Sequence, residues 1–266
     1  MPNVRKHTIN REAFAASYSF GARSDISGHT EVYPLAEINN VFLSVSFFNE
    51  TMNLIFTRMG IYSDGYNFIK AGTVVSRQKG TNEAGILAFL RRMHVGWNIP
   101  AKAMREFFEK TIKLCKSGKK EYCLNLLEQE FYDAVYLPKL SKLSDFTVIA
   151  FSNAFSVHGL ELANRSILHA QYRFIEKYKE AIWNFWHSVV SDSHRNEIRN
   201  IFKRFGYSVD SGDDQVIDEF QAYMLEHENS TGPLNSTGPL DDYLEPYSQK
   251  LLSTLYSAKV YPLQIR

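Results

Sequence analysis

The stretch Asp145-Phe-Thr-Val-Ile-Ala-Phe-Ser152 is the clearest strand candidate in the chain. It is rich in the β-branched and aromatic residues that favour strands. A long segment with helical spacing of apolar residues follows, from about Val157 to Val190. A strand that leads into long helical segments predicts an α+β chain that is mainly helical.

The sequence before and after this region also shows helical spacing. Thr81 is placed to cap a helix that Pro100 ends, and further helices are expected from about Ala101, Lys119 and Ser211. The side chains that we expect to face the core in these helices and in the one before Gly206 are Ile86, Leu90, Met93, Trp97, Met104, Phe108, Ile112, Cys115, Leu126, Leu127, Phe131, Ala134, Val135, Ile198, Ile201, Phe202, Phe205, Val216, Phe220, Tyr223 and Met224.

The region from Thr30 to Ser76 favours extended structure or short helices. Residues 41–48 and 53–57 are rich in strand formers, and Asp64-Gly65 is typical of a two-residue hairpin turn. These short extended segments are expected to pack on the helical part of the chain. The predicted division is an N-terminal mixed or extended segment, 1–76, a helical core, 77–228, and a loop with a C-terminal segment, 229–266.

Composition limits the partners and the location. Thirty basic residues against 29 acidic ones give a net charge of +1, which argues against nucleic acid or an anionic membrane as the main partner. The strongest apolar run, 41–48, is far too short for a membrane span. We see no signal peptide and no disulfide framework, and we expect a cytoplasmic protein, although export by a specialised secretion system would leave the sequence unchanged.

One group of residues in the second half suggests chemistry. The strand 145–152 precedes the stretch Arg165-Ser-Ile-Leu-His169, and a later segment reads Asp218-Glu219-Phe-Gln-Ala-Tyr. Residues 145–228 therefore resemble zinc metallopeptidases of the gluzincin type. In that family two histidines at positions i and i+4 bind zinc, a glutamate between them moves the proton, and a later helix supplies a glutamate as third ligand.

The chain departs from this pattern at the His169 segment. If His169 corresponds to the second histidine, Arg165 replaces the first and Ser166 replaces the catalytic glutamate. If it corresponds to the first, Ala170 and Arg173 stand in their places. Both alignments lose the proton-transfer glutamate and put a cation where a neutral ligand belongs, so no cofactor is expected, and zinc would have only His169 and Glu219 as ligands.

The first alignment suggests that the Arg165 guanidinium replaces zinc and pairs with Glu219, because a bidentate arginine suits a buried carboxylate. The chain would then be a metallopeptidase-like protein without zinc hydrolysis, with Arg165, His169 and Glu219 as binding residues and a protein as partner. Two alternatives remain. One is an enzyme of another class with Glu219, His158 or His169 as acid or base, and the other is a helical interaction protein unrelated to peptidases.

A simpler interpretation of His169 uses the helical wheel. The residue lies opposite the apolar stripe of its helical segment and on the side of the charged residues Arg165, Arg173, Glu176 and Glu180. Such a face is usually solvated and laced with salt bridges. On this interpretation His169 is a surface residue.

Overall fold

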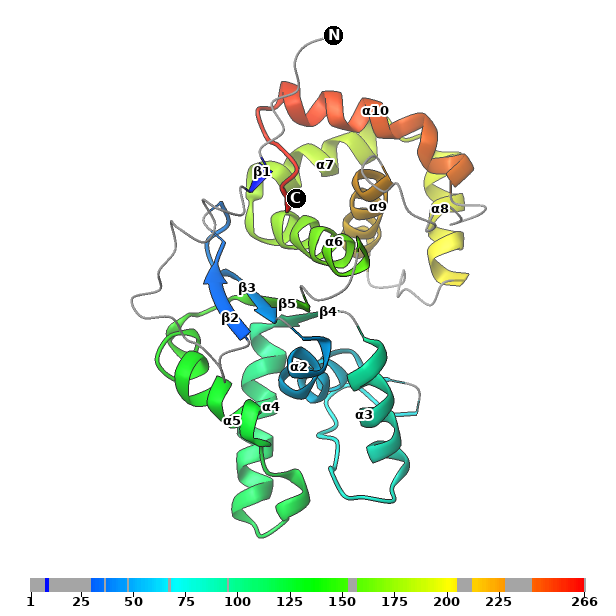
Figure 1. The fold of residues 1–266 in the computed structure, drawn as a ribbon. Helices are drawn as coiled ribbons and strands as arrows, with labels where there is room; N and C mark the ends of the chain where they lie inside the picture. The colour runs from blue at the N-terminus through cyan, green and yellow to red at the C-terminus, as the bar shows by residue number, and fades with distance from the viewer. Residues whose placement is uncertain are drawn as a thin grey trace. The chain divides into compact units, whose positions relative to one another are not determined.

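The computed structural model describes residues 8–9, 30–35, 37–46, 48–66, 68–94, 96–152, 157–204, 212–227 and 241–265. Over these residues the chain is mainly helical with a small sheet, so the predicted α+β class is confirmed (Figure 1). Contacts divide the chain into two compact units, the sheet unit, Glu12–Ala163, and the helical unit, Met1–Arg11 with Asn164–Arg266. These units do not follow the predicted boundaries after residues 76 and 228.

The described residues of the sheet unit form four strands in the order β2-β3-β5-β4. Their bounds are β2 Thr30–Pro34, β3 Val41–Ser46, β4 Gly96–Pro100 and β5 Thr147–Ser152. The central strands β3 and β5 are parallel, with Val41 opposite Thr147, and the edge strands are antiparallel to them. Every residue of β5 is buried, which explains its unbroken run of strand-forming residues. The predicted strands at 41–48 and 145–152 are therefore confirmed over residues 41–46 and 147–152.

The helices of the sheet unit pack around this sheet. They are α2 Asn49–Asp64, α3 Asn82–Met93, α4 Ala101–Lys116 and α5 Leu126–Phe131, with short helical turns η1 Lys120–Tyr122, η2 Tyr132–Tyr136 and η3 Leu140–Lys142. Thr81 caps α3 as predicted, since its side chain accepts a hydrogen bond from the backbone N–H of Ala84. Pro100 directly precedes α4, which begins at Ala101 as expected.

The predicted strand at 53–57 is wrong, because these residues lie inside α2. The helix buries Met52, Ile55, Phe56 and Met59 completely. Because it has no polar face, its sequence lacks the helical period of apolar residues and resembles that of a buried strand. The predicted hairpin at Asp64-Gly65 is also wrong. Asp64 ends α2, and Gly65 follows with a φ of 75°, a conformation that favours glycine.

The helical placement of Trp97, which is buried, and the core placement of two other residues are wrong. Trp97 belongs to β4 rather than to the helix before it, because α3 ends at Met93. Its ring packs against Gly60 of α2, where even a Cβ would collide with it. The predicted helix 119–136 is broken into η1, α5 and η2, and Leu126 and Ala134 are exposed.

The cysteines also differ from expectation. Cys115, near the end of α4, forms a disulfide with Cys123, whose Cα lies 4.7 Å away. Cys115 is half-buried rather than a core residue. Two thiols eight residues apart meet because the chain reverses direction at Gly118, which has a φ of 88°.

The helical unit consists of five helices among the described residues, with one short pair of parallel strands. Their bounds are α6 Val157–Phe174, α7 Glu176–Ser188, α8 Asp192–Arg204, α9 Asp213–His227, α10 Asp241–Ser257, β1 Thr8–Ile9 and β6 Gln264–Ile265, with α6 beginning in the sheet unit. The predicted helical stretch 157–190 is present as two helices that meet at Ile175. Phe205, Gly206, Ser211 and residues 229–240 of the predicted loop lie outside the described residues.

A buried aromatic and aliphatic cluster holds this unit together. Trp186 and Phe220 meet edge to face, with ring centroids 4.8 Å apart, and Tyr247 of α10 packs beside Phe185. Six predicted core residues of α8 and α9 are buried in this cluster: Ile198, Ile201, Phe202, Val216, Phe220 and Met224.

No helix in the described part of the chain is long and apolar enough to cross a membrane.

Candidate functional site

Four charged side chains from α6 and α9 meet in the helical unit. The Arg165 guanidinium donates a hydrogen bond to Glu219 Oε2 at 2.9 Å. His169 lies one turn further along α6, with Nδ1 2.9 Å from Asp218 Oδ1 and Nε2 3.9 Å from Glu219 Oε2. We call Arg165, His169, Asp218 and Glu219 the charged cluster. The structure thus brings together the three residues that the sequence singled out as binding residues.

Helix geometry explains why these four side chains meet. Arg165 and His169 are four residues apart, so they project from the same face of α6. Asp218 and Glu219 are consecutive on α9, where the buried neighbours Ile217 and Phe220 fix the orientation of the helix. Arg165 therefore pairs with Glu219, and His169 contacts Asp218.

The cluster is half-buried, so the predicted solvated face is wrong for its two α6 members. The side chains of Arg165 and His169 are 20% and 19% exposed, whereas Arg173, Glu176 and Glu180 on neighbouring turns are exposed. The Arg165 guanidinium also lies over the ring of Tyr223, 4.0 Å from its centroid. An arginine that stacks on an aromatic ring and pairs with a carboxylate has a fixed orientation.

The surroundings of His169 act on its pKa in opposite directions. Burial lowers the pKa, but the hydrogen bond and charge of Asp218, together with the charge of Glu219, outweigh burial and raise it above its usual value. The positive charge of Arg165 opposes that rise. When His169 is protonated, the cluster holds two cations and two carboxylates and is neutral.

The same geometry can be compared with what a metal needs. Asp218 and Glu219 approach different nitrogens of His169, so the three side chains do not converge on one point. Among the described residues, no group of three or more His, Cys, Asp or Glu side chains is arranged to hold a metal ion. The nitrogen that faces Glu219 is Nε2, and the Arg165 guanidinium shares that carboxylate oxygen.

Asp218 is the member of the cluster to which the sequence analysis gave no role. Its carboxylate accepts a hydrogen bond from Gln221, whose own amide oxygen accepts one from the buried Tyr178 hydroxyl. The sequence signal that could have indicated it is a carboxylate directly before the candidate ligand Glu219, because histidine ligands commonly hydrogen-bond to a carboxylate. The chain Tyr178–Gln221–Asp218 fixes the carboxylate that orients His169.

His158, the other candidate acid or base, falls on α6, but its side chain lies outside the described residues.

A second polar contact ties α9 to α6 and α7. Asp214 accepts a hydrogen bond from the Tyr172 hydroxyl and pairs with Lys179 at 2.9 Å. This pairing supports the position of the helices and places no further reactive group beside His169.

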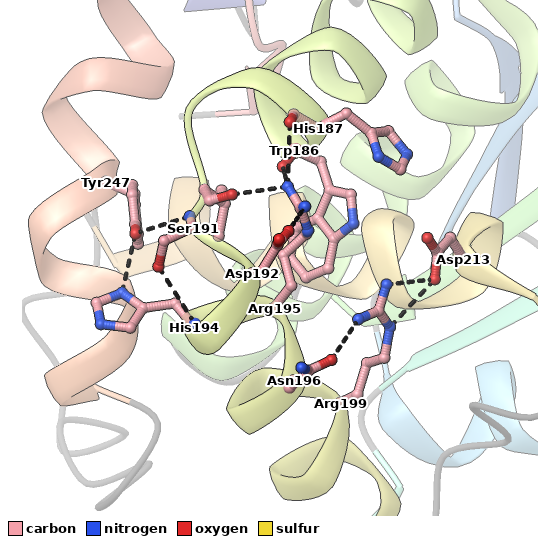
Figure 2. A network of polar contacts seen from close by, with 11 residues as sticks. Trp186, His187, Ser191, Asp192, His194, Arg195, Asn196, Arg199, Asp213 and Tyr247 are labelled. Atoms are coloured by element: carbon pink, nitrogen blue, oxygen red, sulfur yellow. Dashed lines mark hydrogen bonds and ion pairs between the residues drawn. The ribbon is translucent and has the colours of Figure 1, made fainter.

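A larger polar network connects the ends of α7, α8, α9 and α10 (Figure 2). Arg195 donates to the backbone carbonyls of Trp186, His187 and Val190 at the end of α7, and it also pairs with Asp192. Cations commonly satisfy the free carbonyls at a helix C-terminus. Arg195 therefore serves to cap α7.

The other contacts of this network are also structural. The Tyr247 hydroxyl accepts a hydrogen bond from the Ser191 backbone N–H and contacts His194 Nδ1 at 2.9 Å. Arg199 pairs with Asp213 at the start of α9, at 2.7 Å. Because these side chains bridge two helices or cap one, the network fixes α9, one of the two helices that carry the charged cluster, against α8.

Comparisons with protein families, with curated proteins and with solved structures found no match to this chain. The resemblance to gluzincins therefore rests on the residues 145–228 alone, and it stays a prediction. The geometry of the charged cluster is independent of that resemblance.

Proposed function

We propose that this chain is a metallopeptidase-like scaffold without zinc hydrolysis and that it acts by binding another protein. The observation that carries the proposal is the ion pair of Arg165 with Glu219, 2.9 Å long, beside His169 Nε2. The Glu219 oxygen nearest His169 Nε2, which a shared metal would use, is bound by a cation of the chain itself.

The distances support this replacement. Two ligands of one tetrahedral zinc ion lie about 3.3 Å apart, given zinc–ligand distances of about 2.0 Å. His169 Nε2 and Glu219 Oε2 are separated by 3.9 Å, slightly more than that. The guanidinium neutralises the carboxylate, as zinc would, without offering an open position for water. Such a pair preserves the contact between α6 and α9 and removes the chemistry.

Exposed apolar side chains on the same unit support the binding of a protein. Trp183 and Val189 of α7 are 39% and 41% exposed. Val189 also lines a groove between α7 and α10, together with Phe185, Lys250 and Ser253. A groove with an exposed aliphatic residue and a polar rim, and an exposed tryptophan on the same helix, is typical of protein-binding surfaces.

Zinc binding by single variants tests the replacement. Arg165→His restores a histidine pair at i and i+4 next to Glu219, so this variant should bind one zinc ion, measured by calorimetry and by metal content after dialysis. Arg173→His is the matched control. It creates the same spacing with His169 one turn further on, away from Glu219, and should bind no zinc. Tight stoichiometric zinc binding by the unmodified protein would overturn the proposal.

Site-specific crosslinking tests the protein partner. A photoreactive amino acid at position 189 should give a discrete crosslinked product in cells that make the protein, and the same group at the exposed Asn200 of α8 should not. Equal labelling from both positions would contradict a binding surface at the α7–α10 groove.

The alternative of an enzyme of another class has one supporting observation, the Asp218–His169 contact, which orients the ring as general bases often are. Against it, the second carboxylate, that of Glu219, already accepts a hydrogen bond from Arg165. The binding function therefore fits the geometry better.

A further inference from the structure

A groove in the sheet unit exposes two large aromatic side chains. It is lined by Tyr66 and Phe68 on one side and by Thr81, Gly85, Ile86 and Phe89 of the α3 region on the other. Phe68 is 64% exposed and Phe89 is 55% exposed. At Gly85 there is open space where a side chain would be, so the backbone of α3 is accessible to a neighbouring helix. Aromatic side chains at this exposure are typical of interface residues.

The sequence that forms the groove is strongly basic. Residues 66–92 include five basic residues, Lys70, Arg77, Lys79, Arg91 and Arg92, and one acidic residue, Glu83. Lys70, Lys79 and Arg92 are exposed, and among the described residues next to the groove Asp64 is an exposed acid. The rim of the groove is therefore positive, and it favours a partner with an acidic surface.

A surface with the complementary properties exists elsewhere on the same unit. The helical segment α5–η2 exposes Leu126, at 74%, and Leu137 just after it, at 45%. Between Leu126 and Leu137 lie the partly exposed Glu130 and the exposed Asp133, with no basic residue, whereas Glu128 is buried. Asp133 is exposed between the two leucines, and Gln129 donates a hydrogen bond to it. We call Leu126, Asp133 and Leu137 the leucine strip.

We propose that the aromatic groove of one copy of this chain binds the leucine strip of a second copy. The apolar side chains of each surface would be covered by those of the other, and the positive rim would meet the negative helix. The sequence analysis placed Leu126 inward, but the structure exposes it. The apolar side of this helix is therefore not fully covered within the unit, and a second copy would cover the rest.

The positions of the two surfaces determine the form of the association. Both α3 and α5 pack on α2, and Figure 1 shows them on opposite sides of the α2 and α4 helices. One copy therefore cannot fill its own groove. Contact between two different surfaces is heterologous, so each dimer keeps one free groove and one free strip, and the association grows into chains or closes into rings.

Sedimentation of two single variants and their mixture tests this arrangement in the full chain. The unmodified protein should show oligomers that grow with concentration over about 1 to 500 µM, the range of weak self-association. Phe89→Ser removes the groove, and Leu126→Ser removes the strip. Each variant alone should be monomeric, with self-association at least about tenfold weaker. Their equimolar mixture should form dimers and stop there, since only one intact interface remains.

Controls keep this result interpretable. Phe48→Ser changes an exposed apolar residue that belongs to neither surface and should leave the oligomers unchanged. Lys79→Glu and Asp133→Lys alter only charge, and each should weaken the association while thermal unfolding stays unchanged. A monomeric unmodified protein, oligomers that survive both single substitutions, or a mixture of variants that stays monomeric would each overturn the proposal.

Discussion

Arg58 and Glu128, 70 positions apart in the sequence, form an ion pair inside the sheet unit. Their closest atoms lie 2.7 Å apart, and the side chains are 2% and 1% exposed. Arg58 also donates to the backbone carbonyls of Val75, Tyr122 and Cys123, and Glu128 Oε2 accepts from the backbone N–H of Asn125. One buried arginine thus connects α2 with the segments around residues 75 and 122–128.

We predict that Glu128→Ala destabilises the protein by about 3–5 kcal/mol, because it leaves the Arg58 charge buried without its partner. Urea unfolding followed by circular dichroism measures the change. Glu130→Gln, two residues away on the same helix and less buried, should change the free energy of unfolding by less than about 0.5 kcal/mol. Equal effects of the two substitutions would show that the buried pair has no special role.

The disulfide between Cys115 and Cys123 should stabilise the sheet unit. It closes a loop of eight residues, for which chain entropy gives about 2.5 kcal/mol. Cys115→Ser should lower the free energy of unfolding by about that amount under non-reducing conditions. A reducing agent should abolish the difference between the variant and the unmodified protein. Alkylation followed by mass measurement should find no free thiol in the unmodified protein, and two reactive thiols would refute the bond.

Two glycines on neighbouring helices should respond to alanine in opposite ways. A Cβ at Gly60 would lie 1.9 Å from the Trp97 ring, so Gly60→Ala should destabilise the protein by about 3 kcal/mol or more. Gly85 on α3 faces open space, and Gly85→Ala should stabilise it by up to about 1 kcal/mol through helix propensity. Thermal unfolding of both variants measures the contrast. A stable Gly60→Ala variant would mean that Trp97 packs elsewhere.

The charged cluster should make stability depend on pH. Burial lowers the pKa of His169, but Asp218 and Glu219 raise it overall, so the folded form binds this proton more tightly than the unfolded chain. The contribution is therefore complete below the usual histidine pKa near 6.5 and is lost as pH rises through the higher folded value. Asp218→Asn should flatten this fall in the free energy of unfolding, and substitution of the exposed His187 by Gln should not. A pH profile that Asp218→Asn leaves unchanged would contradict this assignment.

Local patterns predicted those elements whose burial is simple. The strand at 147–152 and the start of α3 at its Thr81 cap follow directly from strand-forming residues and from capping chemistry. Helix α2 could not be predicted in this way, since a helix buried on all sides has no period to detect. Trp97 was assigned to a helix because its spacing from Leu90 fits one. Its place in a strand follows from the antiparallel pairing of β4 with β5, in which Trp97 lies opposite Ala150, a partner more than fifty residues later.

The charged cluster could be predicted in part. The sequence suggested that Arg165 pairs with Glu219, and the two side chains form that ion pair. The sequence analysis predicted His169 either as a binding residue or as part of a solvated face, and it assigned no role to Asp218. The difference depends on which turn of α9 faces α6, and that is set by buried residues such as Phe220. Periodicity within one helix cannot supply the rotation of another.

The pairing of β3 with β5 has a consequence for synthesis of the protein. Strand β3 is parallel to β5, with Val41 opposite Thr147. It can therefore pair with β5 only after roughly a hundred further residues have been made. At translation rates of about 5–20 residues per second, this delay is on the order of ten seconds. During that interval the apolar β3 has only β2 as a strand partner, and its open edge is a hazard for aggregation. Slower translation between codons 47 and 146 should therefore lower the yield of native protein, whereas slower translation after codon 152 should have less effect.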